Sequence, residues 1–138
     1  MAQAGRPAAS QEAVVIVHVV LLKVRPSVDP VRLRSFAQAL TAACQEIPTV
    51  RHALVGPRRH IDAGYPRSFG ETTYDYAAVL QFADEEGLQS YLNHPLHADL
   101  GRQFWEISES TVVFEGATVD LKNEPLGADW LANLEQEP

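Results

Sequence analysis

The sequence predicts a single α+β domain. Some segments are rich in β-branched and aliphatic residues, which is typical of strands. Amphipathic segments with helix-capping residues lie between them and are typical of helices. The length of 138 residues suits one domain, and a hydrophobic share of 46% with 21% charged residues is ordinary for a globular protein. The strands are expected at residues 13–24, 50–55, 74–82 and 111–121.

The first predicted strand has apolar side chains on both of its faces. Ile16 and Val20 lie on the same face as His18, and Val17 and Val19 lie on the other. The third and fourth predicted strands repeat this pattern. A strand that is apolar on both faces has to be covered on both, so we expect a layer on each side of the sheet.

Capping residues and prolines mark the helices. Asp29 caps the first helix, Pro30 suits its first turn, and Pro48 ends it. Asp84 caps a second, short helix, and Pro95 ends that helix and starts a third. The apolar stripe of the first helix consists of Leu33, Phe36, Ala37, Leu40, Ala43 and Ile47.

The predicted order of elements is β-α-β-β-α-α-β, a ferredoxin-like pattern whose second crossover is divided in two. This pattern places the helices on one face of a four-stranded antiparallel sheet and leaves the other, apolar face exposed. Packing against a second copy would cover that face. We therefore expect a homodimer, a dimeric α/β barrel whose sheets pack face to face.

Composition and charge exclude several classes of function. A net charge of −7 argues against binding to nucleic acid. The apolar run that begins at Val14 is interrupted by His18 and is too short to cross a membrane. The single cysteine, Cys44, cannot form an internal disulfide, and it lies in an alanine-rich helical pattern typical of packing. We expect a cytoplasmic protein that binds neither nucleic acid nor membranes.

The ends of the chain differ from its centre. Residues 1–12 are small and polar and are expected to form a disordered extension, and residues 13–122 form the domain. The tail of residues 123–138 is acidic, with Trp130 and Leu131 as expected anchors. The loop of residues 57–73 fits a lid, an oligomer contact or a plain exposed insertion.

One short stretch, SYLNHPLHAD, holds a tyrosine and two histidines, Tyr91, His94 and His97. Because Pro95 disrupts the helical spacing of the histidines and no further ligand completes a set, we expect no metal there. His94 and Pro95 together are typical of a helix end followed by the first turn of the next helix. His97 and Tyr91 lie on the two sides of this break and could converge.

Several segments resemble a known family. They are HVVLLK from His18, EIPTV from Glu46 and YLNHPLH from Tyr91, which match H-x-V-x-[FL]-K, E-I-P-x-V and Y-x-x-H-P-x-H. In order and at this spacing they resemble the stress-responsive dimeric A/B barrel family, Dabb, over roughly residues 14–121. The family's fold is the ferredoxin-like dimer that the patterning predicts.

The resemblance also implies site residues. The family includes plant stress proteins and a cofactor-free cyclase that makes olivetolic acid from a linear polyketide. Its catalytic histidine and tyrosine match His97 and Tyr91, and its first-strand histidine matches His18. A third-strand histidine of that cyclase falls at Tyr76 and a helix tyrosine falls at Leu40, so this chain departs from it at two pocket positions.

The chemistry of a His–Tyr pair suits cofactor-free acid–base catalysis, because histidine accepts a proton near neutral pH and tyrosine donates a hydrogen bond to a carbonyl oxygen. We expect His97 and Tyr91 to be catalytic, with substrate bound by His18, Tyr76 and Phe82 and no cofactor. The substrate would be a polyketide-like or aromatic metabolite, and the reaction a cyclisation, lyase or isomerase step. Two alternatives remain open: a non-catalytic stress-related or ligand-binding homodimer whose histidines are structural, and a cofactor-free monooxygenase.

Overall fold

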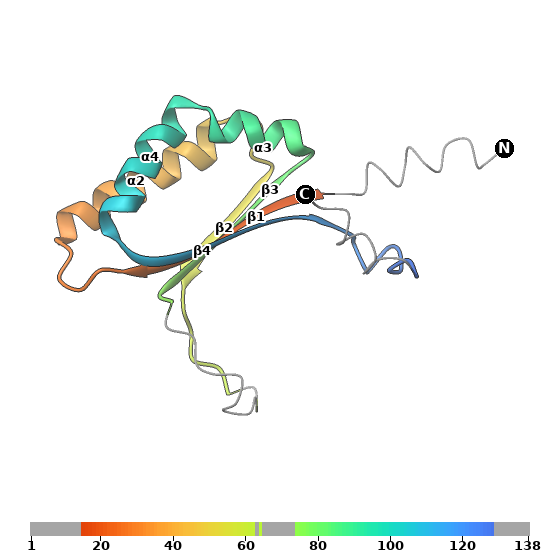
Figure 1. The fold of residues 1–138 in the computed structure, drawn as a ribbon, viewed down its shortest axis with the longest axis horizontal. Coiled ribbons are helices and arrows are strands. Elements are labelled where there is room, and N and C mark those ends of the chain that lie inside the picture. The colour runs from red at the N-terminus through yellow and green to blue at the C-terminus, as the bar shows by residue number, and fades with distance from the viewer. Residues whose placement is uncertain (1–14, 63, 65–73, 129–138) are drawn as a thin grey trace.

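The computed structural model describes residues 15–62, 64 and 74–128 (Figure 1). The predicted extension of residues 1–12, much of the loop of residues 57–73, and the expected anchors Trp130 and Leu131 lie outside the described residues. The elements are β1 Val15–Val24, α2 Pro30–Glu46, β2 His52–Pro57, β3 Tyr76–Phe82, α3 Glu85–Leu92, α4 Pro95–Ile107 and β4 Ser108–Thr118.

The four strands form one antiparallel sheet in the order β2-β3-β1-β4. All three helices lie on the same side of this sheet (Figure 1). The β-α-β-β-α-α-β order and this strand order confirm the predicted ferredoxin-like α+β fold. Because β1 is paired on both sides, each of its side chains is aligned with a residue of β3 and a residue of β4.

The hydrophobic core lies between the sheet and the helices. The alternation of the strands sends Ile16 of β1, and Leu80 and Phe82 of β3, toward the helical layer, where they are buried with Ala43 and Ile47. Burial of large aliphatic and aromatic side chains of this kind is the main favourable contribution to folding.

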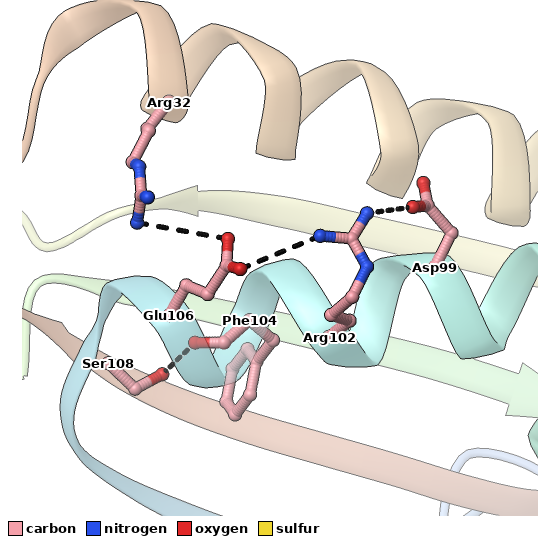
Figure 2. A network of polar contacts seen from close by, with 6 residues as sticks. All are labelled: Arg32, Asp99, Arg102, Phe104, Glu106 and Ser108. Carbon is pink, nitrogen blue, oxygen red and sulfur yellow. Dashed lines mark hydrogen bonds and ion pairs between the residues drawn. The ribbon is translucent and has the colours of Figure 1, made fainter.

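Helices α2 and α4 pack against each other across the top of the core. Phe36 and Phe104 meet there with their ring centroids 6.3 Å apart. On the solvent side, Glu106 pairs with Arg32 at 3.8 Å and with Arg102 at 3.5 Å (Figure 2). These ion pairs are exposed and add little stability individually, so apolar packing such as the aromatic contact contributes more to holding the two helices together.

A helix break lies between α3 and α4. The Asp84 carboxylate caps α3 by accepting a hydrogen bond from the Gly87 N–H at 2.8 Å. After α3, Nδ1 of His94 accepts from the Leu96 N–H at 3.0 Å and caps α4, whose first residue is Pro95. This confirms that His94 and Pro95 form a helix end and a new helix start.

The face of the sheet opposite the helices is apolar and exposed. One row of side chains, Leu54, Val79, Val19 and Phe114, crosses all four strands in register. At its two ends Leu54 is 71% exposed and Phe114 is 58% exposed. The sequence pattern therefore correctly predicted that the helices leave one apolar face uncovered.

The residue bounds of the two edge strands, β2 and β4, differ from the predicted ones. The second strand is His52–Pro57 rather than residues 50–55, because Val50 still belongs to the turn after α2, where its N–H bonds to the Ile47 carbonyl at 3.2 Å. The fourth strand is Ser108–Thr118 rather than residues 111–121. Ser108 ends α4 and starts β4 at once, and its hydroxyl donates to the Phe104 carbonyl at 2.6 Å (Figure 2).

Among the described residues, no helix has the length and apolar character needed to cross a bilayer.

The cap at His94 gives a stability prediction. We expect His94→Ala to lower the free energy of unfolding by about 1 kcal/mol, because the Leu96 N–H loses its acceptor. Urea unfolding followed by circular dichroism measures the change. His94→Asn, whose side chain can also cap a helix, is the control and should keep most of the stability; an equal loss in both variants would contradict the capping role.

Candidate functional site

A cavity of about 420 Å³ lies between the helical layer and the inner face of the sheet. Its walls come from all four strands below and from α2, α3 and α4 above, and most of the lining side chains are apolar. Mostly apolar pockets of this size with a few polar groups are typical small-molecule sites. The residues with polar or titratable side chains on its wall are His18, Tyr76, Tyr91, His97, Trp105 and Glu115.

His18 is the polar residue of the otherwise apolar inner face of β1. It is only 7% exposed, and its Nδ1 lies 2.9 Å from Oε2 of Glu115. The partner is fixed by the sheet register, because His18 lies directly opposite Glu115 in the β1–β4 ladder. A carboxylate can only accept a hydrogen bond, so Nδ1 of His18 carries a proton and donates it to Glu115.

Tyr91 and His97 meet across the helix break. Tyr91 lies at the end of α3 and His97 in the first turn of α4, and their ring centroids are 4.7 Å apart in an edge-to-face arrangement. The centroid of the His18 ring lies 5.9 Å from that of the Tyr91 ring. The break at His94 and Pro95 therefore brings Tyr91 and His97 together, and β1 adds His18 as a third titratable ring.

Tyr91, which carries a hydroxyl group, lines the cavity, although the residue is only 2% exposed. Within the part of the chain that the structure describes, no hydrogen bond is made by this hydroxyl, and no buried side-chain polar atom lacks a partner. The hydroxyl oxygen is therefore not fully enclosed by the protein. Behind it, the fully buried Phe82 supports the tyrosine ring, with centroids 5.3 Å apart.

Burial sets the protonation states of the pair. Burial lowers the pKa of His97 below its usual 6.5, the neighbouring His18 lowers it further, and a hydrogen bond with the Leu92 backbone opposes the shift. Burial, together with the nearby Cys44, raises the pKa of Tyr91. At neutral pH, His97 is therefore an uncharged ring that can accept a proton, and Tyr91 is a protonated donor.

The structure brings four of the five predicted site residues to the cavity: His18, Tyr76, Tyr91 and His97. Phe82 is not on the cavity wall, because its ring is enclosed by the core behind Tyr91. Leu40, at the position of the cyclase's helix tyrosine, also lines the cavity.

The other histidines and the cysteine lie apart from this cluster. His52 and His60 are exposed, as expected for surface residues. Cys44 is half-buried, and burial raises the pKa of its thiol, so it is a packing residue rather than a reactive thiolate.

Glu115 is the site residue that the sequence analysis missed. The signal was present, because alternation along the last predicted strand places Glu115 on the same face as Val113 and Ala117. Only the register of β4 against β1 shows that this carboxylate lies opposite His18.

Among the described residues, no group of three or more histidine, cysteine, aspartate and glutamate side chains is arranged to hold a metal ion.

The fold defines an α+β barrel-type domain with an apolar cavity between its sheet and its helices. Residues 16–117 match the family Dabb, the Stress responsive A/B Barrel Domain. The chain belongs to this family. A comparison with curated proteins found no match.

Solved structures confirm the architecture. A dimeric ferredoxin-like protein of unknown function from Thermobifida fusca is 22% identical, with a TM-score of 0.61 over 78% of this chain and 93% of that chain. A dimeric protein of unknown function with the same fold, from Bacteroides fragilis, is 26% identical, with a TM-score of 0.58 over 75% and 96%. The hydroxynitrile lyase of Passiflora edulis is 13% identical, with a TM-score of 0.64 over 77% and 94%.

The lowered pKa of His97 predicts a dependence of stability on pH. As the pH falls through 6.5, unfolded His97 takes up a proton before the folded residue does, so the free energy of unfolding should decrease. His97→Gln should reduce this decrease, measured by urea unfolding at pH 7.5 and 5.5. His52→Gln, on the exposed edge strand, is the matched control, and an equal pH dependence in the parent and in His97→Gln would contradict the assignment.

Proposed function

We propose that this protein is a cofactor-independent acid–base catalyst acting on a small, largely apolar carbonyl compound. The leading reaction class is cyclisation of a polyketide-like chain, with lyase and isomerase steps as relatives. The observation that carries the proposal is the contact of Tyr91 with His97 on the wall of an apolar cavity.

In this proposal, His97 is the base. Its uncharged ring removes a proton from the carbon next to the carbonyl group of the substrate, and the electron pair of that C–H bond moves into an enolate. The hydroxyl of Tyr91 donates a hydrogen bond to the enolate oxygen and stabilises its charge. The enolate carbon then forms a bond with a second carbonyl carbon, and protonated His97 returns its proton to the new alkoxide.

His18 and Glu115 act as positioning residues. The Glu115 carboxylate fixes the orientation of the His18 ring, in the same way that a carboxylate orients a histidine in many catalytic sites. The His18 ring in turn borders Tyr91 and, as a second basic group, favours the neutral form of His97.

The substrate should differ from that of the olivetolic acid cyclase. The positions of two polar pocket residues of that enzyme are taken here by Tyr76 and Leu40, and both line the cavity. The relation to the cyclase is therefore proposed for the reaction class and the acid–base pair only. The hydroxynitrile lyase shares the fold alone with this chain.

A non-catalytic ligand-binding protein is the second candidate. The observation in its favour is that Glu115 already satisfies His18, as it would for a purely structural buried histidine. In that case the cavity would bind a small molecule without transforming it.

The exchange of carbon-bound hydrogen distinguishes these candidates without knowledge of the natural substrate. In D2O, the protein should accelerate the replacement of hydrogen by deuterium at the carbons beside the carbonyl of 2-nonanone, measured by NMR. We expect His97→Gln to lower the rate by about 100-fold, because it removes the base, and Tyr91→Phe to lower it as well. His52→Gln, at an exposed position that does not line the cavity, serves as the control.

The ligand-binding alternative predicts binding of 2-nonanone without faster hydrogen exchange. If 2-nonanone binds but its hydrogens exchange no faster than with His97→Gln, the catalytic proposal is wrong.

We also propose that two copies pack through their exposed sheet faces. The support is the apolar row that ends at Leu54 and Phe114, together with the dimeric state of the relatives from T. fusca and B. fragilis. A sheet face of this kind is normally covered by another layer. The cytoplasmic location expected from the sequence stays a prediction.

Light scattering tests the dimer. The parent should have a mass of about 30 kDa, twice the 15.2 kDa of one chain, and Phe114→Glu should lower it toward that of one chain because a charge cannot be buried unpaired. Gln38→Glu adds the same charge on an exposed position of α2 and should leave the mass unchanged. A monomeric parent would overturn the proposed assembly.

A further inference from the structure

A stripe of α4 faces the cavity at intervals of four residues. His97, Gly101 and Trp105 all line the cavity and lie on one side of the helix. Trp105 is 64% exposed, although it is large and aromatic, and its ring packs edge-to-face on Phe104 with centroids 5.3 Å apart. The stripe therefore leads from the acid–base pair at one end to an exposed aromatic ring at the other.

Close packing does not explain why a glycine stands in the middle of this stripe. A Cβ atom at Gly101 would meet only Cε1 of His97, at 4.0 Å. Gly87 of α3 is different, because a Cβ there would lie 3.3 Å from Oδ1 of Asp84 and 3.5 Å from Cβ of Thr49. A glycine inside a helix is less stable than alanine, so Gly101 destabilises α4 without relieving a close contact.

We propose that Gly101 determines which ligands fit: the missing side chain keeps open a passage along α4, and the ligand is an elongated carbonyl compound with an uncharged apolar tail. The carbonyl group lies between Tyr91 and His97, a placement that rests on the function proposed above. The tail passes Gly101 and ends against the ring of Trp105.

The charge distribution supports an uncharged tail. Of the described residues on the cavity wall, Glu115 is the one with a carboxylate, and it is paired with His18 beside the acid–base pair. The rest of the cavity wall, which includes Gly101 and Trp105, is mostly formed by apolar side chains such as Leu33, Phe36 and Val113. A charged tail would lose its hydration there without gaining a partner.

Binding can be measured through Trp105 itself. The chain has two tryptophans, so Trp130→Phe leaves Trp105 as the reporter. Saturating 2-nonanone should shift its emission to shorter wavelength as the tail covers the ring. With 2-butanone, which has the same carbonyl group and a short chain, no such shift is expected.

Substitutions at Gly101 then test the passage. In the Trp130→Phe background, Gly101→Leu should weaken the binding of 2-nonanone by roughly tenfold or more, since it displaces about two methylene groups of the tail. Gly101→Ala should weaken binding less and raise the midpoint of thermal unfolding by about 2–4 °C, because alanine favours the helix. A purely structural glycine would not give higher stability together with weaker binding.

Ala98→Leu is the matched control, because it adds similar bulk to an exposed position of the same helix that does not line the cavity. It should bind 2-nonanone as the parent does. Unchanged affinity in a folded Gly101→Leu variant, or no binding of 2-nonanone to the parent, overturns the proposal. If Gly101→Leu fails to fold, the affinity of Gly101→Ala for 2-nonanone is the test. An affinity equal to that of the parent then overturns the proposal.

This experiment is independent of catalysis. Binding of 2-nonanone that depends on Gly101 but is not followed by hydrogen exchange would refute the catalytic function and leave the assignment of Gly101 intact.

Discussion

The central strand β1 imposes the constraint on which the rest of the structure depends. It is paired on both sides and apolar on both faces, so the helices must cover one face and the other stays available to a second layer. The exception on its inner face is His18, a buried polar side chain that needs a partner. The register supplies Glu115 from β4, and this pairing fixes the polar end of an otherwise apolar cavity.

The second constraint is the break between α3 and α4. A continuous helix would place Tyr91 and His97 six residues apart, on different sides of the helix axis. With His94 as the cap and Pro95 as the first residue of α4, the chain changes direction between them, and the two rings come into contact. The enclosing core then keeps His97 uncharged and Tyr91 protonated at neutral pH.

Much of this arrangement could be predicted from local sequence. The apolar alternation of residues 13–24 and the caps at Asp29 and Asp84 gave the order of elements, and the H-P-x-H spacing pointed to Tyr91 and His97. Local sequence could not predict the distances between segments that are far apart in the chain. Glu115 becomes visible only through the pairing of β4 with β1, Phe82 lies behind the site because α3 covers the end of β3, and the space at Gly101 depends on how far α4 lies from the sheet.

The central claim is that a ligand places its oxygen at Tyr91 and His97 and its apolar part along α4. A crystal structure with 4-pentylphenol, whose oxygen resembles that of an enolate, tests it most directly. The account predicts the phenol oxygen within hydrogen-bond distance of the Tyr91 hydroxyl, with the alkyl chain passing Gly101 toward Trp105. A phenol oxygen that lies at Trp105 instead, or a ligand bound outside the cavity, would contradict it.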